Sequence, residues 1–189
     1  MARVFEGTGE LPRVEGTRLD LRQITREDAP ELLKIFGDPE VMRYWSSPPL
    51  EDEAAAVGLV EQIHGHFEAR DLFQWGVALK DSDAVIGTCT LWNLDEANRR
   101  AEIGFALARD EWGRGLASEA VATLIGFAFG ALELHRLEAD VDPENARSLI
   151  LLERQGFKRE GLLRERWHSL GEVQDTVFLG LLRREWTGA

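Results

Sequence analysis

The chain has 189 residues, of which 44% are hydrophobic, and a formal net charge of −12. That length is enough to bury a substantial core and short enough for one domain over residues 1–189. The acidic balance argues against nonspecific binding to nucleic acid, which requires a basic patch; it suits a cationic partner, although solubility explains it equally well. No segment approaches the ~20 apolar residues of a membrane span, and the N-terminal segment lacks the apolar centre of a signal peptide. We therefore expect a cytoplasmic protein that binds neither nucleic acid nor membranes.

Two helices are expected in the first part of the chain. Residues 29–36 place apolar side chains on one helical face, and Gly37 ends the pattern. Residues 56–67 repeat this spacing. His64 and His66 lie on or beside the second helix, with no cysteine or acidic partner at metal-ligand spacing. The sequence therefore predicts no metal site.

Strands are expected next. Alternating apolar residues at 73–79 predict a strand, and a polar turn joins it to the apolar run 85–91 as a hairpin. Cys89, the single cysteine, lies in that run, so we expect a buried thiol, with neither a disulfide nor a cysteine-based zinc site. Further strands are expected around residues 101–107, 136–141, 157–167 and 173–182. The pattern indicates a mixed α/β sheet, largely antiparallel at first, with helices on both faces.

A glycine-rich turn at residues 109–118 lies between a strand and a helix. Ile103, Phe105 and Leu107 alternate with smaller residues before it, and apolar residues at helical spacing follow it over 117–133. The unpaired amides and the positive dipole end of such a helix attract an anion, each charge–dipole contact being worth about 0.3–1 kcal/mol. The turn therefore predicts a site for a phosphorylated cofactor.

The spacing of this turn weighs against a dinucleotide. Five residues separate Leu107 from Gly113, and Ser118 stands where a dinucleotide-binding motif has its third glycine. Glu138 and Asp140 do lie roughly 20 residues further on, as a ribose-binding acid would. A phosphate-binding P-loop is excluded because no Gly-Lys-Ser/Thr follows. A turn that serves only helix–strand packing remains an alternative.

Several further motifs carry a family resemblance over nearly the whole chain. They are Phe-Gly-Asp-Pro-Glu-Val-Met-Arg-Tyr at 36–44, Ala-Glu-Ile-Gly-Phe at 101–105, Asn145-x-x-Ser148 and Gly156-Phe157. In this order they resemble the GNAT acyl-CoA-dependent N-acetyltransferases, and more narrowly the RimJ/RimL branch that acetylates ribosomal-protein N-termini. One departure is Trp112, which stands where the general GNAT turn begins with Gln or Arg.

The resemblance implies both a fold and a cosubstrate. The fold is a mixed, mostly antiparallel sheet of about seven strands, with two central strands that splay apart around the pantetheine arm of acetyl-CoA. Strand residues Ile103, Phe105 and Leu107 would present backbone groups to that arm, and Asn145 would lie near it. The pyrophosphate would bind the amides of Gly113, Arg114, Gly115, Leu116, Ala117 and Ser118.

Direct attack of an amine on the thioester requires a base, an oxyanion donor and a hydrogen-bond donor for the departing thiolate. Glu102 is the candidate base, acting through water, and Ser148 is the candidate thiol-side donor. A strand backbone N–H can serve the oxyanion. Two structural alternatives stay open: Glu102 pairs with Arg99 or Arg100, and Asn145 with Ser148 only caps a helix.

The acceptor side is expected at two segments. Tyr44 and Trp45 precede a Pro-Pro break and resemble the mobile acceptor lid of the family, with a core position as the alternative for Trp45. His168 and Asp175 flank the final turn and are candidate substrate contacts, unless they belong to a solvated loop. The favoured acceptor is a protein N-terminal α-amine. A small amine such as a polyamine, amino acid or aminoglycoside, and a non-catalytic acyl-CoA-binding module, are the alternatives. A homodimer is compatible with the family.

Overall fold

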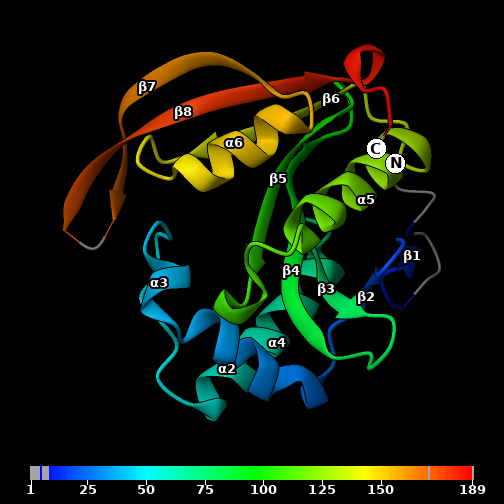
Figure 1. Cartoon of the computed structure of the whole chain (residues 1–189), viewed down its shortest axis with the longest axis vertical. Helices are drawn as coiled ribbons and strands as arrows, with labels where there is room; N and C mark the ends of the chain where they lie inside the picture. Colours follow the sequence, from blue (N-terminus) through cyan, green and yellow to red (C-terminus); the bar gives the residue numbers. More distant parts are fainter. Residues whose placement is uncertain (1–4, 6–8, 170, 189) are drawn as a thin grey trace.

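The computed structural model describes residues 5, 9–169 and 171–188, which form a mixed α/β fold around one open sheet (Figure 1). The sheet has eight strands in the order β1-β2-β3-β4-β5-β6-β8-β7. All neighbours are antiparallel except β5 and β6. The strands are β1 (Val14–Glu15), β2 (Leu19–Arg22), β3 (Leu72–Leu79), β4 (Val85–Asp95), β5 (Arg100–Leu107), β6 (Arg136–Val141), β7 (Lys158–Ser169) and β8 (Glu172–Leu182). The expected mostly antiparallel mixed sheet is confirmed, with eight strands instead of about seven.

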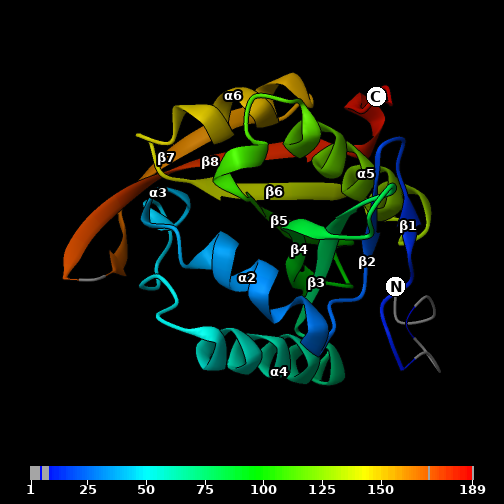
Figure 2. The same ribbon diagram turned by 60° about the horizontal axis from the view of Figure 1, so that its bottom comes forward.

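Helices cover both faces of the sheet, as the sequence predicted. Figure 2 shows α5 and α6 on one face and α2 and α4 on the other. The helices are α2 (Ala29–Phe36), α3 (Pro39–Met42), α4 (Glu53–Ala69), α5 (Leu116–Gly130) and α6 (Ala146–Arg154), with short 3-10 turns η1 (Arg26–Asp28), η2 (Arg109–Glu111) and η3 (Arg183–Glu185). Helix α5 ends three residues before the predicted end.

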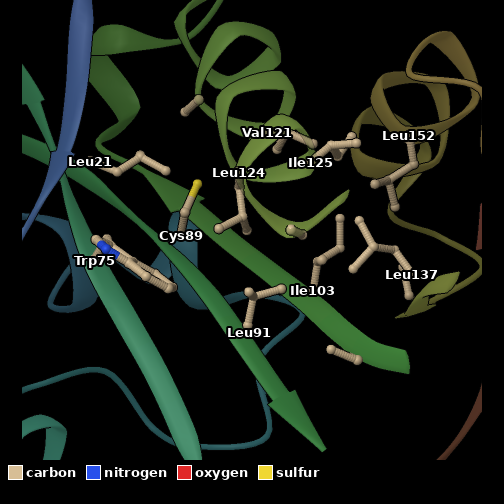
Figure 3. Close-up of a cluster of buried hydrophobic side chains, with 14 of the residues drawn as sticks. Leu21, Trp75, Cys89, Leu91, Ile103, Val121, Leu124, Ile125, Leu137 and Leu152 are labelled. Atoms are coloured by element: carbon tan, nitrogen blue, oxygen red, sulfur yellow. The ribbon is translucent and has the colours of Figure 1, made fainter. Parts of the chain in front are cut away.

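The larger core fills the space between the sheet and the α5/α6 layer. Figure 3 shows Leu124 of α5 pointing toward Cys89 and Leu91 of β4. These three side chains are fully buried. Burial raises the pKa of the Cys89 thiol to about 12, so the thiol stays protonated and unreactive at neutral pH. The expectation of a buried strand thiol is confirmed.

The two parallel strands at the centre of the sheet separate after a short contact. Strands β5 and β6 pair at three positions, the last of which joins Glu102 to Glu138. Beyond it, β5 continues to Leu107 beside β4, while β6 continues to Val141 beside β8. The described strands therefore diverge toward their carboxyl ends, which confirms the splayed central strands.

A break in β4 accompanies this divergence. The register between β4 and β5 shifts between Trp92 and Asp95, and Asn93 in this segment has a positive φ of 49°. Such bulges bend a strand and redirect side chains. Here the bulge places the Asn93 amide beside Glu102, which begins the diverging part of β5.

Strands β7 and β8 form a long hairpin at the edge of the sheet. Figure 1 shows it extending beyond the other strands, on the same side of the molecule as α3. The residues that lie far along it include the partly exposed side chains of Leu162, Leu163, Trp167 and Val173. The hairpin and α3 therefore flank the open end of the β5–β6 divergence.

Candidate active site

The turn before α5 has the geometry of an anion site. Gly113 and Gly115 both have φ of +76°, in the left-handed region that favours glycine. Within the described ranges, no side chain caps the first turn of α5, and a Cβ added at Gly113 would meet no atom within 4 Å. The amides of this turn can therefore receive a ligand at the positive end of a 15-residue helix. The backbone fits a diphosphate.

The turn stands at the end of the divergence because β5 leads directly into it. The indole N–H of Trp112 donates to the Leu107 carbonyl oxygen at 2.8 Å, which fixes the loop between β5 and α5. On the far side of the turn, the Gln155 side chain donates to the Ser118 hydroxyl at 2.7 Å. Leu116 is buried in the core, while Ala117 and Ser118 are half-buried. Helix α6 therefore packs along the turn.

Asn145 and Ser148 lie at the start of α6. The Ser148 backbone N–H donates to the Asn145 side-chain oxygen at 3.2 Å, so Asn145 is the N-cap of α6. The capping alternative is correct for the Asn145 oxygen. Ser148 is half-buried, and the role of its hydroxyl toward the thiol stays a prediction.

Glu102 is buried at the point where β5 and β6 separate, with 6% of its surface exposed. Its Oε1 atom accepts a hydrogen bond from the Asn93 side chain at 2.6 Å. Arg100 instead pairs with Glu138 at 2.7 Å and Asp95 at 3.5 Å. Among the described residues, neither Arg99 nor Arg100 forms an ion pair with Glu102. The ion-pair alternative is therefore wrong.

The surroundings of Glu102 favour its protonated form. Burial, and then repulsion from the carboxylates of Asp140 and Glu138, raise the pKa of Glu102, although the Asn93 hydrogen bond and the Arg166 charge oppose the shift. A carboxylate with a raised pKa is a better proton acceptor than an ordinary glutamate. The position suits a general base.

Sequence reasoning did not select Asp140 as a site residue in this fold. The neighbours of Glu102, Glu138 and Asp140 along β5 and β6 pack into the α5/α6 core, and side chains alternate along a strand. The three carboxylates therefore share the opposite face. The alternation was visible in the sequence, but only the parallel pairing of the strands brings them together.

Asp140 also joins β6 to the hairpin. Its carboxylate accepts the indole N–H of Trp167 at 3.1 and 3.2 Å and the hydroxyl of Thr176, and it lies 3.9 Å from Arg166. These contacts hold the hairpin beside the face of the sheet that carries Glu102, Glu138 and Asp140, which we call the acidic face. Trp167 was not among the predicted site residues.

The predicted lid residues divide into two roles. The Tyr44 hydroxyl donates to the backbone oxygen of Glu144 at 3.2 Å, which brings the end of α3 to the loop before α6. Trp45 packs edge-to-face on Phe36, with ring centroids 5.4 Å apart. The core alternative is therefore correct for half-buried Trp45, and Tyr44 is the residue that reaches toward the site.

The two other candidate acceptor residues lie on the hairpin. His168 is exposed and is paired with Val173. The Asp175 carboxylate accepts the Glu165 backbone N–H at 2.8 Å, at a β7 residue with φ of +53°. Asp175 thus supports a bulge in the hairpin, and contacts of either residue with a substrate stay a prediction.

The two histidines of α4 have other partners. His64 Nε2 lies 2.8 Å from the Ile24 carbonyl oxygen, and His66 Nδ1 lies 2.8 Å from Asp71 Oδ1. The described part of the chain holds no group of three or more His, Cys, Asp or Glu placed to bind a metal ion. None of its helices has the length and hydropathy needed to cross a membrane.

Comparison with known families decides the class of protein. A family model described as an acetyltransferase (GNAT) domain matches residues 18–158, which include the turn, Glu102 and the start of α6. The chain belongs to the GNAT acetyltransferase family. This acetyltransferase is therefore an acyltransferase enzyme, and the dinucleotide-binding alternative is wrong. Glu138, the candidate ribose ligand, is instead paired with Arg100 and Arg136.

Relatives of this acetyltransferase include proteins with different named acceptors. An uncharacterised N-acetyltransferase, p20, from Bacillus licheniformis is 40% identical over 90% of this chain and 96% of its own. An Escherichia coli enzyme named for the alanine of ribosomal protein uS5 is 26% identical over 97% and 98%. A solved Vibrio cholerae spermidine N-acetyltransferase in complex with CoA and spermine has a TM-score of 0.77, with 26% identity over 89% and 97%. The relatives support N-acetyl transfer and leave the acceptor open.

Proposed function

We propose that residues 1–189 act as one domain that transfers acetyl from acetyl-CoA to the α-amine of a protein or peptide N-terminus, of the ribosomal-protein type. The observation that carries the chemistry is buried Glu102, which has a raised pKa and lies where β5 and β6 separate. An N-terminal amine has a pKa near 8 and needs less help to lose its proton than an alkylammonium near 10. The uS5-alanine enzyme, which aligns over almost the full chain, supports this acceptor.

The cosubstrate fits the divergence and the turn. Acetyl-CoA supplies a thioester that an amine attacks directly. In our proposal the backbone of Ile103, Phe105 and Leu107 lines its pantetheine arm, and the amides of the Gly113–Ser118 turn bind its diphosphate. Because the Asn145 oxygen caps α6, the Asn145 amide nitrogen is the group left to face the arm.

Three groups would then handle the amine and the thiol. Glu102 takes the amine proton through water, and the Asn93 hydrogen bond keeps the carboxylate oriented. The Ser148 hydroxyl donates to the departing sulfur. Tyr44 covers the acceptor, while His168 and Asp175 are the proposed contacts from the hairpin.

A small amine is the second candidate acceptor. The carboxylates of Glu102 and Asp140 attract ammonium groups, and a polyamine carries several of them. The similarity to the spermidine N-acetyltransferase supports this candidate in the same way that the uS5 enzyme supports the first.

A panel of acceptors tests whether the enzyme acetylates a peptide N-terminus or a small amine. Peptides with different first residues, polyamines, amino acids and aminoglycosides are incubated with acetyl-CoA and analysed by mass spectrometry. Our proposal expects one acetyl group on the α-amine of particular peptides. Acetylation of a small amine with every peptide unmodified would contradict it. The Glu102→Gln variant on the same panel separates enzymatic from spontaneous acetylation.

The effect of Asp140 on the pKa of Glu102 can be tested by titration. Asp140→Asn removes a negative charge that raises the pKa of Glu102, so that pKa is expected to fall. The carboxyl carbon of Glu102 reports this value by ¹³C NMR, assigned by comparison with Glu102→Gln. Asp175→Asn on the hairpin is the matched control and is expected to leave the pKa of Glu102 unchanged. A Glu102 pKa that stays fixed or rises in Asp140→Asn would show that Asp140 does not act on Glu102.

A further inference from the structure

Trp112 is the position at which the chain departs from its family, since the general turn begins with Gln or Arg. An indole cannot supply the cation that an arginine would place there. The Trp112 ring is instead held by its N–H bond to Leu107 and presents a face toward α6.

That face carries an arginine from another element. The Arg147 guanidinium carbon lies 4.8 Å from the Trp112 ring centroid, within the range of a cation–π contact. Arg147 is the second residue of α6, and the same helix contacts Ser118 through Gln155 at its other end. Helix α6 therefore spans the anion-binding turn, with Arg147 beside the start of the turn.

No acidic side chain in the part of the chain that the structure describes pairs with Arg147. Arg18 and Arg114 lie beside the glycines of the turn, and each has a carboxylate partner: Arg18 pairs with Glu119 at 2.7 Å, and Arg114 pairs with Glu111. Arg147 forms no ion pair with any described residue, and its side chain is exposed. Stacking on an aromatic face holds a guanidinium while leaving its in-plane N–H donors available. In a chain of net charge −12, an unneutralised arginine at an anion site suggests an anionic ligand.

We propose that Arg147, held on the ring of Trp112, binds the diphosphate of the CoA cosubstrate from the α6 side of the turn. The backbone amides of the turn then hold one side of the diphosphate, and the guanidinium holds the other. This inference rests on the proposed function, since it assumes that the turn binds CoA. It assigns to α6 the cation that the first position of the turn lacks.

Calorimetric titration with CoA tests the proposal without relying on turnover. Arg147→Ala is expected to weaken CoA binding about tenfold, as the loss of a charge-assisted hydrogen bond does. The dependence of the CoA dissociation constant on salt is expected to flatten in the same variant. Arg147→Lys keeps a charge but loses the fork and the stacking, so we expect an intermediate affinity.

Two controls isolate the role of Arg147. Arg26→Ala removes an exposed arginine in η1 and changes the net charge equally, so we expect wild-type affinity. Trp112→Phe keeps an aromatic face and is expected to bind CoA more tightly than Trp112→Leu. Circular dichroism melting curves establish that each variant is folded.

The outcomes distinguish this inference from the proposed function. If the wild-type protein binds CoA and Arg147→Ala binds it with equal affinity, the role of Arg147 is overturned and the proposed function is not. An equal loss in Arg26→Ala would also overturn it, because the effect would then be general electrostatics. Wild-type protein that does not bind CoA would contradict the proposed function itself.

Discussion

Glu102→Gln is expected to lower kcat by about 10²–10⁴-fold, which is the usual contribution of a general base. The substitution keeps the shape of the side chain and an oxygen that can accept the Asn93 hydrogen bond. It removes only the ability to take a proton. The dissociation constant for CoA is expected to stay at its wild-type value, because the amides of the turn and Arg147 do not depend on Glu102. Steady-state kinetics and calorimetry measure the two quantities.

The stability of the same variant gives an independent readout. Because folding raises the pKa of Glu102, its ionised form disfavours the folded state, and this cost appears as the pH rises through the folded-state pKa. A neutral glutamine avoids that cost, so Glu102→Gln is expected to melt at or above the wild-type temperature at pH 7. Glu61→Gln, on an exposed position of α4, is the matched control for both measurements. A kcat within twofold of wild type in folded Glu102→Gln would rule out Glu102 as the base.

Trp75→Ala is expected to reduce the free energy of unfolding by about 3–5 kcal/mol, in the range for loss of a fully buried aromatic side chain. Trp75 on β3 is 0% exposed and packs edge-to-face on Phe127 of α5, with ring centroids 5.6 Å apart. Its indole N–H also donates to the Pro12 carbonyl oxygen at 3.0 Å. The substitution therefore creates a cavity and removes a hydrogen bond that ties the segment before β1 to the sheet.

Urea unfolding monitored by circular dichroism measures this loss. A smaller core lies around α2 and α4, and half-buried Trp45 packs at its edge. Trp45→Ala is the comparison and is expected to reduce the free energy of unfolding by less than Trp75→Ala does. Trp75→Phe keeps most of the apolar volume and is expected to fall between wild type and Trp75→Ala. A loss below about 1 kcal/mol in Trp75→Ala would mean that the core relaxes around the missing ring.

Much of the fold was predictable because its signals are local. Helix α5 and strand β5 carry periodic apolar residues. The two glycines between them have a positive φ, a backbone conformation that glycine favours and that a glycine-rich segment therefore indicates. Strands β1 and β2 were missed because they have only two and four residues, too few for a clear alternation. Strand β2 is instead held by its pairing with β3 and by Leu19 and Leu21, which are fully buried in the core.

The sequence predicted on which elements the candidate site residues lie, and it did not predict which side chains they contact. The sequence motifs predicted that Glu102 lies on a strand and that the glycine-rich turn precedes a helix, and the structure has both features. The sequence could not show whether Glu102 pairs with Arg100, because the ion pairs of Arg100 depend on the register between β5 and β6. In that register Arg100 pairs with Glu138. The bulge that supplies Asn93 to Glu102 has no distinct signal in the sequence.

By itself, the sequence indicated most of the helices and strands, the glycine-rich turn before α5 and the family, since each depends on residues that are close together in the chain. The tertiary structure decided which distant side chains meet: Asp140 with Trp167, Tyr44 with the loop before α6, and Arg147 with Trp112. Strand register and helix packing set those contacts. Both depend on burial of the whole core, so no local segment of the chain encodes them.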